Sequence, residues 1–163
     1  MKKKLLLAAP TLAIGALLTL TACSAPAAQD APAPVVETAT SDPIIGEWTM
    51  TSLEFSTDGE FADVPFGGQI IFTEAGTVAV QAQNPDATAP DTAYTVQGYE
   101  AFYGDATIDE DAGTFSVEVE SAAARDLIGQ TLVRNFEVTD DTLVLTPVDA
   151  SEGWRVTYEH ASR

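Results

Sequence analysis

From residue 43 onward, apolar and polar residues alternate in short segments that are separated by turn residues. Alternation with a period of two is typical of strands that bury one face. The pattern predicts about eight strands, at the spacing of a sandwich or a barrel. Their expected ranges are 47–55, 69–73, 77–81, 104–108, 114–120, 130–138, 142–146 and 154–159.

The alternation also assigns side chains to the faces of the sheet. A strand with one apolar and one polar face is typical of an antiparallel sheet that is wet on one side. Eight such strands can close into a barrel that is wide enough to hold one small ligand. In the last four strands the residues expected to share the apolar face are Phe115, Val117, Val119, Leu132, Arg134, Phe136, Val138, Leu143, Leu145, Trp154, Val156 and Tyr158.

Two segments between the strands have a spacing closer to that of a helix. In the range 92–102, Ala93, Val96 and Tyr99 are followed by Phe102 or Tyr103, which is near helical periodicity. The range 122–128 is long enough for one or two helical turns. We therefore predict an all-β fold, an up-and-down antiparallel barrel of about eight strands with one or two short helices.

The first 42 residues follow a different pattern. Three lysines, an apolar stretch over residues 5–20 and a run of small residues ending at Cys23 have the layout of a secretory signal. The stretch is shorter than the roughly 20 apolar residues of a spanning helix, and it contains Pro10 and Gly15. The sequence Leu-Thr-Ala-Cys over residues 20–23 resembles the lipobox of bacterial lipoproteins.

This resemblance implies cleavage before Cys23 and lipidation of its sulfur. It divides the chain into a signal peptide (1–22), a lipidated cysteine with an Ala- and Pro-rich tether (23–42) and a barrel domain (43–163). The tether carries too little apolar surface to fold by itself. We expect the protein in the cell envelope, held by its lipid. By resemblance to Gram-negative sorting signals, Ser24 favours the outer membrane, and in a Gram-positive organism the anchor is the outer face of the cytoplasmic membrane.

The charge of the mature chain limits its partners. Cleavage leaves four arginines against 25 acidic residues, a formal charge of −21. Such a surface repels nucleic acid and anionic headgroups, so we expect no nucleic-acid partner and attachment to the membrane through the lipid. The acidic residues are scattered, which favours a role in solubility. The domain has the size of one ordinary unit, and we expect a monomer.

The barrel domain is similar to lipocalins. Ile45-Gly46-Glu47-Trp48 is similar to the Gly-x-Trp motif that opens the first strand of lipocalins and related calycin barrels. More closely, the chain resembles the bacterial lipocalin-like domain family over about residues 44–160. The matching stretches, taken in their joint order, are 45–52, 71–76, 99–104, 109–114, 119–120, 129–136 and 143–145.

Two positions depart from the family pattern. Val117 and Glu118 stand where members often carry a His pair, so chemistry attributed to that pair is not expected. His160 stands where the family usually has arginine. In lipocalins a late arginine packs across the tryptophan of Gly-x-Trp, and Arg155 or Arg163 are the candidates to replace it. We expect Trp48 to close this end of the barrel.

Arg134 is the most informative charged residue because it shares the expected inward face with Leu132 and Phe136. A buried arginine must be paired. One interpretation is an internal ion pair, with Glu120 of the preceding strand as the partner. The other is that the planar guanidinium of Arg134 binds the carboxylate or another anionic group of a ligand.

Aromatic residues complete the candidate site. Tyr99, Phe102 and Tyr103 could line an apolar pocket with hydroxyls at its edge, and core packing is the alternative. The candidate ligand-binding residues are therefore Arg134, Glu120, Tyr99, Phe102, Tyr103 and Phe136.

The sequence shows no arrangement that predicts a metal, a cofactor or a nucleophile. The acids at 105 and 109–111 lack the alternating ligands of a calcium loop, and turn chemistry explains 109–113 better. His160 is the only histidine, and no phosphate-binding loop occurs.

We therefore favour a membrane-anchored lipocalin-like lipoprotein that binds a small, mostly hydrophobic ligand in the cell envelope, over an enzyme. Two alternatives remain open. One is a cyclase- or isomerase-type enzyme that uses the barrel interior, with Arg134, Glu120 and the tyrosines as its groups. The other is a structural or interaction barrel that is filled by its own side chains.

Overall fold

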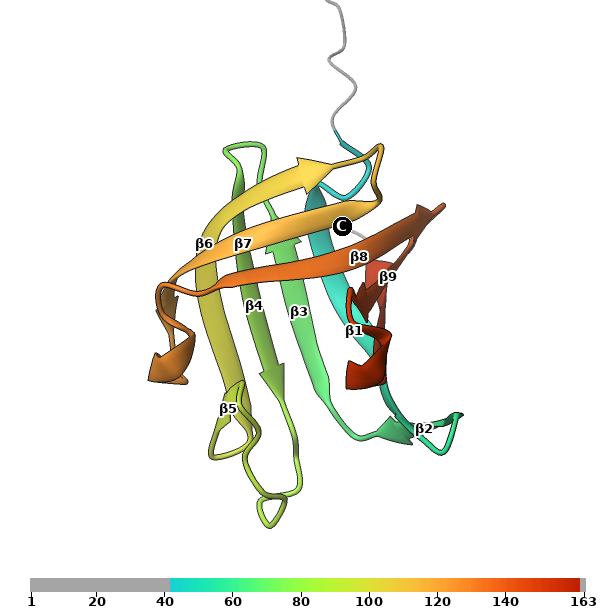
Figure 1. The fold of residues 1–163 in the computed structure, drawn as a ribbon, viewed down its shortest axis with the longest axis vertical. Coiled ribbons are helices and arrows are strands. Elements are labelled where there is room, and N and C mark those ends of the chain that lie inside the picture. The colour runs from blue at the N-terminus through green and yellow to red at the C-terminus, as the bar shows by residue number, and fades with distance from the viewer. Residues whose placement is uncertain (1–41, 162–163) are drawn as a thin grey trace, which may run out of the picture. The chain divides into compact units, whose positions relative to one another are not determined.

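A computed structural model of the chain describes residues 42–161, which form a closed antiparallel barrel of eight strands (Figure 1). The barrel strands are β1 (Gly46–Thr57), β3 (Gly67–Phe72), β4 (Thr77–Gln83), β6 (Tyr99–Asp109), β7 (Thr114–Ala122), β8 (Thr131–Thr139), β9 (Thr142–Pro147) and β10 (Trp154–His160). Each pairs with the next in this order, and β10 pairs back to β1. The predicted all-β, up-and-down barrel is confirmed.

The expected signal peptide, the lipidation site Cys23 and the tether up to residue 41 lie outside the described residues. Within residues 42–161, no helix has both the length and the apolar character needed to cross a bilayer.

Two short strands lie outside the ring of eight. β2 (Glu60–Val64) pairs with the second half of β1, and β5 (Thr95–Val96) pairs with the start of β6. β2 was not expected from the sequence. Pro65 separates it from β3 because proline has no N–H to donate to a strand ladder. Helical turns in the described chain are confined to the 3₁₀ turns η1 (Arg125–Leu127) and η2 (Ala150–Glu152).

The expected helix over 92–102 is wrong. This range contains a turn, the two residues of β5, a second turn and the start of β6. Gln97 has a φ of 55°, which lies in the left-handed region and is incompatible with a right-handed helix. The other expected helix, over 122–128, is reduced to the single turn η1.

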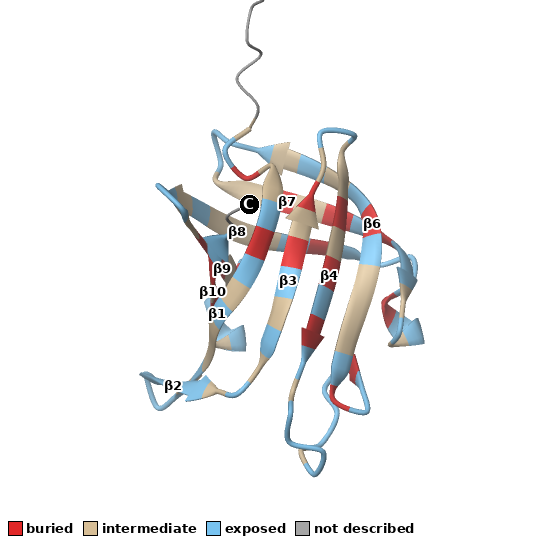
Figure 2. Cartoon of the chain, turned by 180° about the vertical axis from the view of Figure 1, so that it is seen from behind, coloured by how far each residue is buried: buried red, intermediate tan, exposed pale blue. Residues whose placement is uncertain are grey.

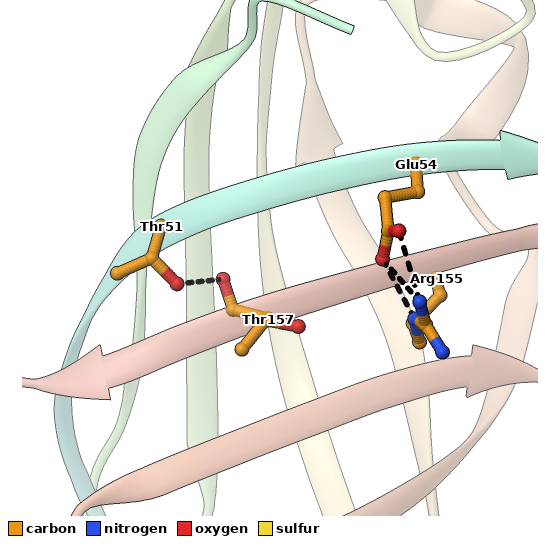
Figure 3. Close-up of polar contacts among 4 residues, drawn as sticks. All are labelled: Thr51, Glu54, Arg155 and Thr157. Atoms are coloured by element: carbon orange, nitrogen blue, oxygen red, sulfur yellow. Dashed lines mark hydrogen bonds and ion pairs between the residues drawn. The ribbon is translucent and has the colours of Figure 1, made fainter. Parts of the chain in front are cut away.

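The seam between β1 and β10 closes the barrel, and its outer face carries polar contacts (Figure 3). Arg155 donates two hydrogen bonds to the carboxylate of Glu54, at 2.7 and 2.9 Å. The Thr51 hydroxyl donates to the backbone carbonyl of Thr157 at 3.2 Å. Closure pairs the edges that an open sheet would leave free.

The core gathers at the end of the barrel where β1 begins. Trp48 is 1% exposed, and its indole N–H donates to the carbonyl of Ile44 at 2.8 Å. The rings of Trp48 and His160 meet edge to face, with centroids 4.8 Å apart. A Cβ on Gly46 would lie 2.8 Å from Nε2 of His160, and Gly46 has a φ of 148°, so glycine is needed there.

His160 therefore occupies the position at the tryptophan where the family resemblance implies an arginine. Arg155, one of the expected replacements, is paired with Glu54 on the outer face, and Arg163 lies outside the described residues. The role of Trp48 as the residue that closes this end stays a prediction, which its burial supports.

The predicted inward faces of the last four strands are confirmed. Figure 2 shows buried bands that cross β1, β3, β4 and β7. Every second residue of β7 from Phe115 to Val119 is buried, as are Leu143 and Leu145 of β9. The Phe72 and Phe115 rings pack edge to face with centroids 5.0 Å apart, which joins β3 to β7 across the interior of the barrel.

Candidate ligand-binding cavity

The interior of the barrel contains a cavity of about 380 Å³. This volume lies near the small end of the range for ligand pockets, about 300–1,000 Å³. Most of the wall is apolar, because the inward positions of the strands carry aliphatic and aromatic side chains. The apolar lining residues in the strands include Met50, Leu53, Ile70, Val78, Val80, Phe102, Phe115, Val117, Leu132, Leu145 and Val156.

The cavity has a sealed end and an exposed end. Trp48, Phe72 and Leu143, each at most 2% exposed, lie toward the start of β1 and do not line the cavity. The exposed lining residues include Phe55 at the end of β1 and Glu152 in η2. These two residues and the segment 84–98 between β4 and β6 therefore define the mouth.

Arg134 is the one arginine that lines the cavity within the described chain. It projects inward from β8 because it lies two residues from both Leu132 and Phe136, on the same face of the strand. Its Nη2 donates to the hydroxyl of Tyr94 at 2.7 Å, and its Nη1 donates to the carbonyl of Val133 at 2.8 Å. The guanidinium carbon lies 5.7 Å from the centroid of the Tyr94 ring and 5.1 Å from that of Trp154, within the range of cation–π attraction.

Glu100 is a second charged group in the cavity, projecting from β6. Burial raises the pKa of the Glu100 carboxyl to about 7, although the positive charge of Arg134 lowers it in part. Glu100 therefore exchanges its proton near neutral pH. Burial, together with the nearby Glu100, raises the pKa of Tyr158. Tyr158 keeps its hydroxyl proton at neutral pH and is available as a donor.

The segment 84–98 brings Tyr94 to the cavity from the side of the mouth. The Asp91 carboxylate accepts hydrogen bonds from the backbone N–H groups of Gln97 and Gly98, at 2.9 and 2.8 Å. The Thr95 hydroxyl accepts one from the N–H of Thr92 at 2.7 Å. These local bonds shape the segment, and the contact between Tyr94 and Arg134 ties it to β8.

Only part of the expected binding set meets in this cavity. Arg134 and Phe102 line it. Phe136 lies beside it, with its ring centroid 6.4 Å from that of Phe115. Tyr99 and Tyr103 are 39% and 50% exposed on the outer face of β6, because they alternate with the inward residues of that strand.

The expected pairing of Arg134 with Glu120 is corrected by the structure. Glu120 is exposed and does not line the cavity. It follows the buried Val119 in β7, so its side chain points to the opposite face. The inward carboxyl comes instead from Glu100, which was not among the residues predicted from the sequence. The signal in the sequence was that Glu100 lies two residues from Phe102, so the two side chains share one face of the strand.

The end of the cavity where Arg134 and Glu100 lie is called the polar end below. Three further residues there were not proposed as ligand contacts from the sequence. Tyr94, Trp154 and Tyr158 all line the cavity. Trp154 and Tyr158 were expected on the inward face of the last strand, whereas Tyr94 fell in the range expected to be helical. The Trp154 indole N–H donates to the carboxylate of Glu152 at 3.1 Å.

The acidic turn between β6 and β7 carries turn hydrogen bonds. The Asp109 carboxylate accepts from the backbone N–H of Ala112 at 2.9 Å. Within residues 42–161, no group of three or more His, Cys, Asp or Glu side chains is arranged to hold a metal ion.

These features define a class of protein: a lipocalin-like β-barrel with an apolar interior and a few polar groups at one end of it. No protein-family model matches the chain, and no curated protein matches it either. Among solved structures, the chain is similar to the crystal structure of an uncharacterized protein from Bacteroides eggerthii DSM 20697. The two share 16% identity over 72% of this chain and 98% of that chain, with a TM-score of 0.44.

Proposed function

We propose that this protein is an envelope lipoprotein whose barrel binds a small, mostly hydrophobic ligand. The observation that carries the proposal is the cavity of about 380 Å³, which an apolar wall surrounds. Pockets with an apolar wall and a few convergent polar groups are typical of small-molecule sites. The cavity also disfavours the alternative of a barrel that is filled by its own side chains.

The sequence supports the location. The lipobox-like residues before Cys23 and the segment from 24 to 42 would place the barrel at a membrane surface. Two acyl chains on the cysteine hold a protein there stably. The ligand would then be taken up or stored close to the bilayer.

The two tryptophans allow a direct test of where an apolar ligand binds. Trp154 lines the cavity, whereas Trp48 is sealed beneath it. Decanol is a suitable neutral probe, added to the mature chain with Cys23→Ser so that no detergent is needed. We expect decanol to change the fluorescence of Trp48→Phe, in which Trp154 remains, and to leave that of Trp154→Phe unchanged.

Calorimetry on the same samples checks binding without relying on fluorescence. Trp154→Phe should still bind decanol, because phenylalanine preserves most of the apolar contact. The unsubstituted chain replaces Trp48→Phe if that variant does not fold. Absence of measurable decanol binding to a folded chain would contradict the proposed function.

A further inference from the structure

The polar end of the cavity holds the positive charge of Arg134, and among the described residues no carboxylate lies within ion-pair distance of it. Among residues 42–161, the structure records no ion pair for Arg134, whereas Arg155 on the outer face is paired with Glu54. Arg134 contacts a hydroxyl, a carbonyl and two aromatic rings, and it also interacts electrostatically with Glu100. The hydroxyl, the carbonyl and the rings carry no net charge, and Glu100 is neutral while it holds its proton, up to about neutral pH. A half-buried guanidinium is stabilised strongly when an anion binds to it.

The other polar groups at this end donate hydrogen bonds, or can do so when they are protonated. Tyr94 and Tyr158 carry hydroxyls, and Glu100 carries an inward carboxyl that holds its proton up to about neutral pH. Glu152 lies at the mouth, where its carboxylate accepts the Trp154 N–H. With Glu100 protonated, the inner part of this end has one positive charge and several O–H groups.

We propose that the ligand is a single-chain amphiphile with a carboxylate head, which binds to Arg134 while its chain lies along the apolar wall. This inference rests on the proposed function and specifies the ligand of the same cavity. The planar guanidinium presents parallel N–H groups that match the two oxygens of a carboxylate. A cationic head would instead be repelled by the positive charge of Arg134.

The arrangement around the head comes from four separate elements. Arg134 lies on β8, Glu100 on β6, Tyr158 on β10 and Tyr94 in the segment before β5. The Tyr94 hydroxyl already accepts from Nη2 of Arg134, so the incoming carboxylate takes over this donor. Tyr94 can then donate its own proton to the carboxylate.

Binding is coupled to the proton on Glu100. A carboxylate head beside Glu100 favours the protonated form of that residue, because two like charges repel each other. Glu100 interacts electrostatically with Arg134 and Tyr158, and the other titratable groups that line the same cavity are Tyr94 and Glu152. The affinity for the carboxylate therefore decreases as the pH rises through about 7, where Glu100 loses its proton.

Three probes with the same chain and different heads test the charge of the site: decanoate, decanol and decylamine. Calorimetry on the mature chain with Cys23→Ser, at about pH 6 where Glu100 is mostly protonated, gives their dissociation constants. We expect decanoate to bind roughly tenfold or more tightly than decanol, and decylamine to bind most weakly.

Two arginine variants distinguish binding inside the cavity from binding to the outer surface of the barrel. Arg134→Gln should weaken decanoate binding by roughly tenfold to a hundredfold and leave decanol binding within about twofold. Arg155→Gln, on the outer face, should leave the order of the three probes unchanged. Glu100→Gln should remove most of the fall in decanoate affinity between about pH 6 and about pH 8.

The outcomes distinguish this inference from the proposed function. If decanol binds but decanoate binds no more tightly, or if decylamine binds best, the carboxylate inference is overturned and the apolar cavity stands. The carboxylate inference is also overturned if Arg134→Gln weakens decanol binding as much as decanoate binding. If none of the three probes binds the folded chain, the proposed function fails with it.

Discussion

At the scale of single residues, Glu100 shows how burial changes the chemistry of a carboxyl group. Its pKa is raised to about 7, mainly because the cavity removes water from the charged form. The unfolded chain releases this proton near the ordinary value of 4.5. The folded protein therefore holds a proton that the unfolded chain has lost, between about pH 4.5 and about 7.

This difference makes stability depend on pH in a defined direction. The free energy of unfolding decreases as the pH rises through that window. Above about pH 7 the full destabilisation caused by the buried charge of Glu100 is present. We expect Glu100→Gln to raise the free energy of unfolding by up to roughly 3 kcal/mol at about pH 8, and by close to nothing at about pH 4. Urea unfolding at the two pH values measures this difference.

Glu120→Gln is the matched control for the same experiment. Glu120 is exposed on β7, so its substitution should change the free energy of unfolding by less than about 0.5 kcal/mol at either pH. An equal gain for Glu100→Gln at both pH values would contradict a buried carboxyl that titrates near neutrality.

At the scale of elements, β6 shows what the sequence pattern could and could not settle. Strict alternation predicted most strands to within a few residues, because each buries one face. The start of β6 was missed because Val96, Tyr99 and Tyr103 also fit a helical spacing. All three are exposed, so their spacing reflects no buried helix face.

The site was predictable to a similar extent. The inward position of Arg134 followed from alternation along β8, and the outward position of Glu120 followed from the same rule in β7. Tyr94 could not be predicted as the neighbour of Arg134. The two residues are 40 positions apart, and no local pattern fixes a contact between a loop and a distant strand.

Gly104 is a position where the pairing of β6 with β7 requires the absence of a side chain. The register between the two strands shifts at Tyr103 and Gly104. A Cβ on Gly104 would lie 1.9 Å from the carbonyl oxygen of Glu118, so the backbones would have to separate. We expect Gly104→Ala to lower the free energy of unfolding by about 1–3 kcal/mol or more, measured by urea unfolding.

Gly67 in β3 provides the control for this prediction. A Cβ there would meet no atom within 4 Å, so Gly67→Ala should change the free energy of unfolding by less than about 0.5 kcal/mol. Equal effects of the two substitutions would show that close approach of the strands is not the cause.

At the scale of the whole molecule, the charge of the chain bears on how the proposed lipoprotein would be held at a membrane. All three lysines precede Cys23, and the chain from Cys23 onward has four arginines against 25 acidic residues. Such a chain gains no attraction from anionic lipid headgroups. Stable attachment of the proposed lipoprotein would therefore depend on a lipid on Cys23.

We expect Cys23→Ser to move the protein from the membrane fraction to the soluble fraction, and to abolish labelling with palmitate. Fractionation of cells that express the two forms measures this change. Ser24→Ala is the control, because it leaves the cysteine in place and should keep the protein with membranes. Continued membrane association of Cys23→Ser would show that another part of the chain is the anchor.

The end of the barrel that contains the buried Trp48 has a consequence for how the proposed ligand would be exchanged. Trp48 and His160 meet at that end, so under the proposed function a bound molecule would leave by the opening through which it arrived. A second ligand molecule would have no separate entrance from which to displace the first, so it could bind only after the first had dissociated. Under the proposed function the barrel would hold one ligand at a time, and the residence time of that ligand would set the rate of exchange.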